Sequence, residues 1–343
     1  MPSMDTALPF VSPEKSTTDR LRPVPAPPWL RGGMRVASAL APGAAARVAR
    51  RLFFTPLRAR VRDEERAVLA RGERFEMEAG GGRVVGRAWG EGPAVLLVHG
   101  WGGHAGQMTS LVDPLVAAGC RAVALDLPGH GESGGRVSSL VHFASALARA
   151  ASLFGPVHGI AAHSFGAAGS AYAMASGLVA RRAVFFAPPL GFESFWLRFR
   201  TGVGVSQEVM DRMLREAEEW LDVRFDGIAP GDVAPRMTAP LLVLHDREDR
   251  EVPFEEGAEL ARRWPGAELR PVEGLGHLRL LRDEKCVAAA VGFLALTPQP
   301  LSPGPPPALP GREGLRPSST SSSRLSPSSP RSGGWRAGRR GPG

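Results

Sequence analysis

The sequence predicts an α/β protein with a mostly parallel central sheet covered by helices on both faces. From Arg74 onward, short apolar runs alternate with stretches of helical periodicity, which is typical of strands joined by crossover helices. Several of the runs are nearly continuous Val, Leu, Ile and Ala, as expected of strands buried on both faces. One connection, residues 188–239, is too long for an ordinary loop and indicates an inserted cap.

Each element can be assigned in chain order within a predicted domain of residues 74–297. A hairpin over Arg74–Ala88, turning at the three glycines 80–82, comes first. The strands expected after it are Ala94–Val98, Ala122–Leu125, Val157–Ala161, Ala183–Phe186, Leu241–Leu244 and Glu268–Pro271. The expected helices are Met108–Ala118, Leu140–Leu153, Phe165–Ala175, Phe254–Trp264 and Leu280–Leu294. The cap, which precedes the penultimate strand, contains a helical stretch around Ser206–Val223.

The positive charge of the chain, +8 in total over 343 residues, lies in its two flanks. Residues 20–62 hold ten arginines and no acid, and residues 298–343 hold seven arginines and one glutamate. Residues 63–297 hold 24 basic and 30 acidic residues, so the central domain is mildly acidic and nucleic-acid binding is not expected. Residues 298–343 are rich in Pro, Ser, Gly and Arg, and we expect them to be a disordered tail.

Residues 1–73 form a Pro- and Arg-rich N-terminal extension. Partial helical spacing between Ala37 and Arg71, interrupted at Pro56, predicts a basic helix. We favour its packing on the rest of the protein with its arginines in solvent; the alternative is that residues 35–62 lie on an anionic membrane surface. No apolar run is long enough to span a bilayer, and the first ten residues lack the pattern of a secretory signal. The expected location is therefore the cytoplasm.

The strongest local signal is the segment 162–166, Ala-His-Ser-Phe-Gly. It follows an apolar strand and precedes a helix of small residues, which is the context of a nucleophile elbow. Such a turn needs small residues two positions before and after the serine, here Ala162 and Gly166. It holds the serine hydroxyl at the positive end of a helix. Ser164 is therefore the candidate nucleophile.

A second signal is the glycine-rich loop that directly follows the strand Ala94–Val98. Its glycines let the backbone approach a substrate oxygen and present N–H groups to it. The amides of Trp101 and Phe165 are the candidate donors. Four polar residues nearby are interpreted as ordering their loops rather than acting as acids, bases or ligands: His99, His104, Asp126 and His130.

The third signal is a pair of loops after the last two strands. The segment 245–253, His-Asp-Arg-Glu-Asp-Arg-Glu-Val-Pro, can supply a carboxylate that orients a histidine from the next loop. Asp249 is favoured for this role, with Asp246 and Glu248 as alternatives. His277, the last histidine of the chain, follows the final strand on a loop with two glycines.

Together these motifs resemble those of the α/β-hydrolase superfamily, in particular of bacterial serine esterases and lipases. The resemblance covers about residues 74–296. It implies the α/β-hydrolase fold and the chain order of nucleophile, acid and base seen here. The roles it implies are nucleophile for Ser164, carboxylate partner for Asp249, general base for His277, and amide donors for Trp101 and Phe165. Two positions depart from the family pattern: Ala162 replaces a glycine, and Asp246 stands where the pattern His-Gly-x-x-Asp has glycine.

The activity expected is hydrolysis of carboxylic esters through an acyl-enzyme. The cap contains six aromatic residues, and of these Trp196 and Phe199 are expected to line a pocket for small to medium apolar acyl groups. An acyltransferase with the same triad and a non-catalytic binding protein of the same fold remain alternatives. The expected partner is a small-molecule ester.

No metal or organic cofactor is expected, because the chemistry needs none and the two cysteines, Cys120 and Cys286, have no metal-ligand spacing. The substrate, the choice among ester, thioester and amide, and the oligomeric state are left open by the sequence.

Overall fold

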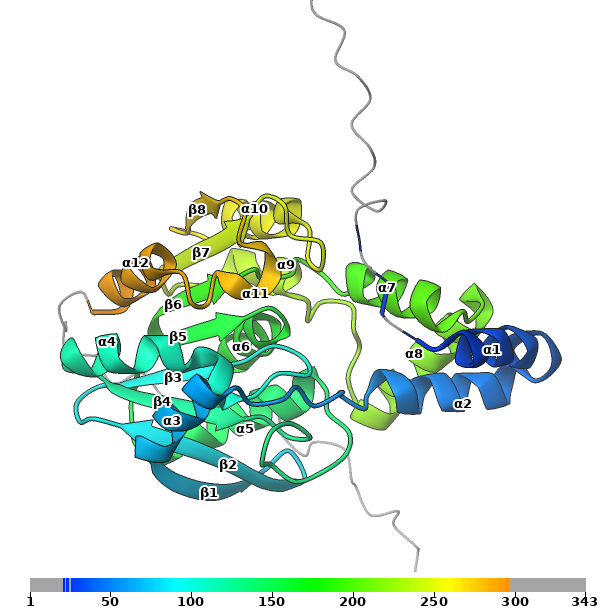
Figure 1. The fold of residues 1–343 in the computed structure, drawn as a ribbon. Helices are drawn as coiled ribbons and strands as arrows, with labels where there is room; N and C mark the ends of the chain where they lie inside the picture. Colours follow the sequence, from blue (N-terminus) through cyan, green and yellow to red (C-terminus); the bar gives the residue numbers. More distant parts are fainter. Residues whose placement is uncertain (1–20, 22, 25, 296–343) are drawn as a thin grey trace, which may run out of the picture. The chain divides into compact units, whose positions relative to one another are not determined.

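The structure, a computed structural model, describes residues 21, 23, 24 and 26–295, and the predicted tail 298–343 lies outside them. An eight-stranded sheet with the strand order β1-β2-β4-β3-β5-β6-β7-β8 runs through the molecule (Figure 1). The strands are β1 (Glu73–Ala79), β2 (Gly82–Trp89), β3 (Ala94–Val98), β4 (Arg121–Asp126), β5 (Val157–His163), β6 (Ala180–Phe186), β7 (Leu241–Asp246) and β8 (Glu268–Val272). The predicted hairpin is β1–β2. It is antiparallel, as is the β2–β4 pair, and all other pairs are parallel.

Helices cover both faces of this sheet, as the sequence predicts. Side chains alternate along β3, so that Leu96 and Val98 lie in one apolar core and Val95 and Leu97 in the other. The first core is closed by α5 (Leu140–Phe154), α6 (Phe165–Ala175), α9 (Pro230–Val233) and α10 (Phe254–Arg263). The second is closed by α3 (Asp63–Arg71), a 3₁₀ helix η2 (Ala105–Leu111), α4 (Val112–Ala117) and α12 (Glu284–Ala295). Both faces of β3 and β5 are therefore buried. This explains the unbroken apolar sequence of β3, whereas β5 also buries His158 and His163.

Two helices differ from the prediction. The helix expected over Met108–Ala118 is the pair η2 and α4. The helix expected from Leu280 begins at Glu284, because Asp283 accepts a hydrogen bond from the Cys286 amide (2.9 Å) and caps the helix there. The residues before it form a short helix α11 (Gly276–Arg279).

The cap lies between β6 and β7, before the penultimate strand, and contains α7 (Glu193–Val203) and α8 (Gln207–Leu221). The N-terminal region forms α1 (Pro28–Leu40) and α2 (Pro42–Phe53), so the helical pattern is broken first at Ala41 and then after Phe53. The four helices lie together (Figure 1) and share an apolar cluster built from their inward residues. The N-terminal helices thus pack on the cap. None of the helices in the described part of the chain has the length and apolarity needed to cross a membrane.

Candidate active site

The backbone at Ser164 has the conformation of a sharp elbow between β5 and α6. Its φ of 51° is positive, which costs energy for a residue with a side chain. A Cβ at Gly166 would collide with the carbonyl oxygen of His99, so glycine is required there. The Ala162 methyl is fully buried in the core, so this departure from the usual glycine is accommodated by packing.

His277 lies between the hydroxyl and a carboxylate. Its Nε2 is 2.9 Å from Ser164 Oγ, and its Nδ1 is 2.7 Å from Asp249 Oδ2. A carboxylate can only accept, so Nδ1 carries the proton and Nε2 is free to accept one from the serine. The three residues singled out as catalytic in the sequence are therefore brought into one hydrogen-bonded chain.

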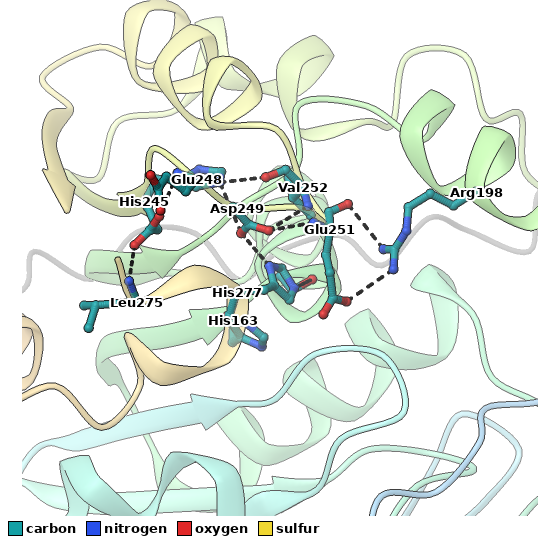
Figure 2. A network of polar contacts seen from close by, with 11 residues as sticks. His163, Arg198, His245, Glu248, Asp249, Glu251, Val252, Leu275 and His277 are labelled. Atoms are coloured by element: carbon teal, nitrogen blue, oxygen red, sulfur yellow. Dashed lines mark hydrogen bonds and ion pairs between the residues drawn. The ribbon is translucent and has the colours of Figure 1, made fainter. Parts of the chain in front are cut away.

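Asp249 is held as an anion by the loop around it. Its Oδ1 accepts hydrogen bonds from the backbone amides of Glu251 (2.7 Å) and Val252 (3.1 Å), as Figure 2 shows. The Nε2 of His245 lies 3.6 Å from Oδ2. Burial alone would raise the pKa of this carboxyl, but its contacts with His245, His277 and the backbone outweigh burial and hold the pKa well below its usual range.

The alternative acid, Asp246, has a different task. Its side chain is fully buried at the end of β7, and its two oxygens accept from the amides of Glu248 (2.7 Å) and Leu275 (2.6 Å). It thereby ties the loop that carries Asp249 to the loop that carries His277. Glu248, the third acid considered, enters this network through its amide rather than through its carboxylate.

Two imidazoles near the triad were not singled out in the sequence. His163, just before the nucleophile, donates from Nε2 to the carbonyl oxygen of His277 (2.8 Å), because a carbonyl can only accept. Burial lowers the pKa of His163 to about 3, and the nearby His277 adds to this effect. His245 donates to the carbonyl oxygen of Val252 (3.1 Å). Their positions in the sequence, next to Ser164 and to Asp246, were the only signal of these roles.

The glycine-rich loop after β3 lies against the nucleophile. A Cβ placed on Gly100 would be 3.1 Å from Ser164 Cβ. Neither the Trp101 amide nor the Phe165 amide has an acceptor among the described residues. Phe165 is the first residue of α6, so its amide is one of those that a helix leaves unpaired at its start. Both amides are therefore available to a ligand.

Three polar residues near this loop, His99, Asp126 and His130, accept backbone hydrogen bonds that hold it in place. His99 Nε2 accepts from the Leu127 amide (3.0 Å), and His130 Nε2 accepts from the Gly102 amide (3.0 Å). Asp126 accepts from the amides of Ala105 and Glu132 (2.7 and 2.8 Å). The buried His104 lies 3.8 Å from Glu65 of α3.

Arg58, between α2 and α3, was missed in the sequence, where it is one arginine among ten. Its guanidinium donates to four carbonyl oxygens of a single turn, at distances of 3.0–3.1 Å: those of Gly129, Gly131, Ser133 and Gly135. That turn carries His130, which accepts from Gly102. The next residue, Ala59, donates its amide to the Gly102 carbonyl oxygen (2.9 Å). The N-terminal region thus contacts the loop of Trp101 directly through Ala59 and indirectly through the turn that carries His130.

The cap aromatics divide into two groups. The Phe195 ring lies 5.7 Å from the Phe165 ring, centroid to centroid, beside the elbow. Trp196 borders both the cluster that contains Phe165 and the cluster of the N-terminal helices. Phe199, one helical turn further, is 5% exposed and packs edge-to-face on Phe53 of α2 at 5.0 Å. Phe199 therefore faces the N-terminal helices, whereas Phe195, which the sequence did not single out, lies beside the elbow.

Arg198 connects the cap to the acid loop. It lies on α7 and donates to the carbonyl oxygen of Glu251 (3.2 Å) and to its carboxylate (3.3 Å), as Figure 2 shows. The amide of the same Glu251 donates to Asp249.

No cluster of three or more metal-ligating side chains occurs within residues 26–295 or the few described residues before them.

Comparisons with known proteins agree with this architecture. Residues 95–289 match the sequence profile of the Alpha/beta hydrolase family. No curated protein sequence matches. Among solved structures, similarity extends to Est1E from Butyrivibrio proteoclasticus, solved with ferulic acid (17% identity, 64% of this chain and 97% of that chain, TM-score 0.51). It also extends to a putative lipase from Acinetobacter baumannii (20% identity, 67% and 93%, TM-score 0.52). A third is the esterase Pf2001 of Pyrococcus furiosus (18% identity, 70% and 95%, TM-score 0.53).

The fold and the strand order define an α/β hydrolase. Because the family profile matches more than half of the chain, the protein belongs to the Alpha/beta hydrolase family. The structural likenesses, all at low identity, bear on the fold.

Proposed function

We propose that this protein is a serine hydrolase that cleaves carboxylic esters through an acyl-enzyme on Ser164. The observation that carries the proposal is the hydrogen-bonded chain from Ser164 through His277 to Asp249. His277 Nε2 takes the hydroxyl proton as Oγ attacks the ester carbonyl, and it then gives that proton to the leaving alcohol. Asp249 keeps the imidazole in the required tautomer and stabilises its charged form. Water, activated by the same nitrogen, releases the acid.

The negative charge that develops on the carbonyl oxygen needs donors already in position. The amides of Trp101 and Phe165 serve as these donors. The Phe165 amide has the further advantage of the positive end of the α6 dipole. The contacts of Arg58, His130 and Gly102 keep the Trp101 amide from relaxing away from the substrate.

The proposed substrates are esters with apolar acyl groups. Aromatic rings from the body and the cap meet beside the nucleophile, notably Phe165 and Phe195, and a site for small apolar ligands is built in this way. Two of the similar structures are named as an esterase and a putative lipase, and the protein solved with ferulic acid holds an aromatic acid. These names support ester chemistry without indicating a particular ester.

A fluorophosphonate probe and a panel of p-nitrophenyl esters of graded acyl length test the proposal. The wild type should be labelled at one site and should hydrolyse the esters, while Ser164→Ala, folded to the same extent, should do neither. If the wild type showed neither labelling nor turnover, the protein would instead be a non-catalytic binding protein of this fold. Turnover that yields mainly a new ester when a second alcohol is added would instead indicate an acyltransferase.

A further inference from the structure

The two N-terminal helices expose large apolar side chains to an unusual degree. Among the described residues, twelve large hydrophobic side chains are exposed, and six of them lie within residues 29–57. The most exposed are Trp29 (76%) and Leu40 (81%) at opposite ends of α1 and Leu57 (76%) after α2. Isolated exposed apolar residues need no explanation, but a concentration on one pair of helices does.

These side chains form a second apolar stripe that packing does not use. On α1, Trp29, Val36 and Leu40 are spaced by seven and four residues and so lie on one side of the helix. The residues that α1 buries, Met34 and Ser38, lie on another side. α2 repeats the arrangement: Val48 and Leu52 are exposed one turn apart, while its buried positions are alanines.

The charge of the same helices is entirely positive. Arg31, Arg35, Arg47 and Arg51 are exposed, and none of them forms an ion pair with a described residue. No acid occurs between residues 20 and 62. The neighbouring helix α8 carries five acids against two arginines, and Glu208, Asp211 and Glu219 are the exposed acids. Within the four-helix group, the net positive charge is therefore concentrated on α1 and α2.

We propose that the exposed face of α1 and α2 docks on the surface of an anionic lipid bilayer. Exposed apolar side chains, one of them a tryptophan, flanked by unpaired arginines are the composition of a helix that lies in the interface. Anionic headgroups attract the arginines, and the apolar side chains enter the boundary between headgroups and acyl chains. Docking leaves α8 and its acids turned away from the lipid. It does not depend on the catalytic chemistry.

Because α1 and α2 share an apolar cluster with α7, docking brings the cap to the lipid. If the function proposed above is correct, esters held in a membrane then meet the enzyme on the side of its cap. A nucleic acid would be attracted by the same arginines but would gain nothing from Trp29 and Leu40. A second copy of the chain could bury the same apolar residues, but its arginines would face those of the first copy and repel them.

Flotation of the full chain with vesicles tests the docking. Phosphatidylcholine vesicles that contain phosphatidylglycerol should carry the protein, and vesicles of phosphatidylcholine alone should carry far less. Arg35→Gln with Arg51→Gln should weaken binding by roughly five-fold for each arginine removed. Trp29→Ser with Leu40→Ser should weaken it as well. Ser164→Ala should bind as the wild type does, which separates this proposal from the catalytic one.

Control variants on the body are Leu153→Ser and Val179→Ser, which remove other exposed apolar side chains (47% and 61% exposed) and should leave binding unchanged. Truncation after Pro300 removes the other basic flank and should also leave it unchanged. Binding that is lost with the tail but kept in the helix variants would overturn the proposal. Equal binding to both vesicle types would also overturn it. So would binding of nucleic acid but not of vesicles at the same salt concentration. A dimer in sedimentation that is dissociated only by the Trp29 and Leu40 substitutions would instead indicate a contact between two copies of the chain and would overturn it as well.

Discussion

The two nitrogens of His277 have fixed and different partners, and this asymmetry determines which substitutions matter. Nδ1 donates to Asp249, so the carboxylate selects the tautomer in which Nε2 faces Ser164. Asp246, three residues earlier, binds the backbone of the two loops rather than the imidazole. The buried aspartate at the end of β7 therefore joins the two loops, and the one in the following loop orients the imidazole.

Asp249→Asn and Asp246→Asn should separate these properties. Asp249→Asn should lower kcat by about 10⁴-fold, because the amide favours the wrong tautomer of His277. Asp246→Asn loses one of two buried acceptors, so it should lower the unfolding free energy by about 1–3 kcal/mol and affect kcat much less. Steady-state kinetics and urea titrations of both variants give the comparison. The reverse ranking of the kcat values would assign the catalytic acid to Asp246.

Arg58→Met should lower kcat by about ten- to a hundred-fold with little change in KM. The guanidinium holds the turn that supports Gly102, and a loosened Trp101 amide affects the transition state more than the bound substrate. Arg60→Met is the control, since Arg60 is exposed nearby without these contacts. Added guanidinium ion, at concentrations that do not denature the wild type, should restore part of the activity of Arg58→Met. Equal kinetics for Arg58→Met and Arg60→Met would rule out this positioning role.

At the scale of elements, two phenylalanines one turn apart on the cap helix α7 contact different parts of the protein. Phe195 reaches the ring of Phe165 beside the nucleophile, and Phe199 packs on Phe53 of α2. One helix therefore joins the candidate pocket to the N-terminal helices.

Phe195→Ala should change the acyl-length profile, whereas Phe199→Ala should change stability. Loss of the Phe195 ring enlarges the space beside Ser164, so the optimum should move to longer acyl groups, each added methylene contributing at most about 0.8 kcal/mol. Phe199→Ala leaves a cavity in a buried cluster and should cost about 3–5 kcal/mol. The ester panel and thermal unfolding measure the two effects. A profile altered only in Phe199→Ala would return the pocket to the residue expected from the sequence.

The sheet could be predicted from the sequence, and the packing of the N-terminal helices could not. Runs such as Ala94–Val98 are apolar on both sides, and this pattern specifies a strand with a helix layer on each face. Periodicity along α1 indicates that Met34 faces a core but not which core, and its partners in α7 and α8 lie about 170 residues away in the sequence. The same holds for Arg58, whose carbonyl partners are 71–77 residues distant and carry no side-chain signal. The hydroxyl, the imidazole and the carboxylate of the candidate triad could be singled out in the sequence because each follows its own strand.

At the scale of the whole molecule, several histidines are buried in neutral form. Burial lowers the pKa of His130 to about 4 and that of His163 to about 3, and it lowers the pKa of His99 strongly as well. An unfolded chain binds these protons near pH 6.5. Protons therefore bind preferentially to the unfolded state at mildly acidic pH.

The stability of the protein should accordingly be fully present above about pH 6.5 and should fall as the pH is lowered toward 4. Over this range the free energy of unfolding should change by up to about 1.4 kcal/mol per pH unit for each such histidine. Asp249, whose pKa is depressed, adds a loss only below about pH 4, where the unfolded chain becomes protonated. Urea unfolding at pH 7, 6 and 5 measures the trend. His130→Gln should make the decrease in unfolding free energy with falling pH shallower. Equal unfolding free energies at pH 7 and pH 5 would contradict the conclusion that these histidines are buried in neutral form.

The helices around the cap are joined to the rest of the protein by three separate stretches of chain. One leads from α2 to α3, one leaves the sheet after β6, and one returns to α9. The first is fastened by Arg58, and the cap is fastened again where Arg198 meets Glu251. A flap that swings needs one axis of rotation, and a cover attached at three distant places has none. We therefore expect a substrate to reach Ser164 through movements of single side chains, such as rotation of the Phe195 ring, rather than through movement of the cap as one body.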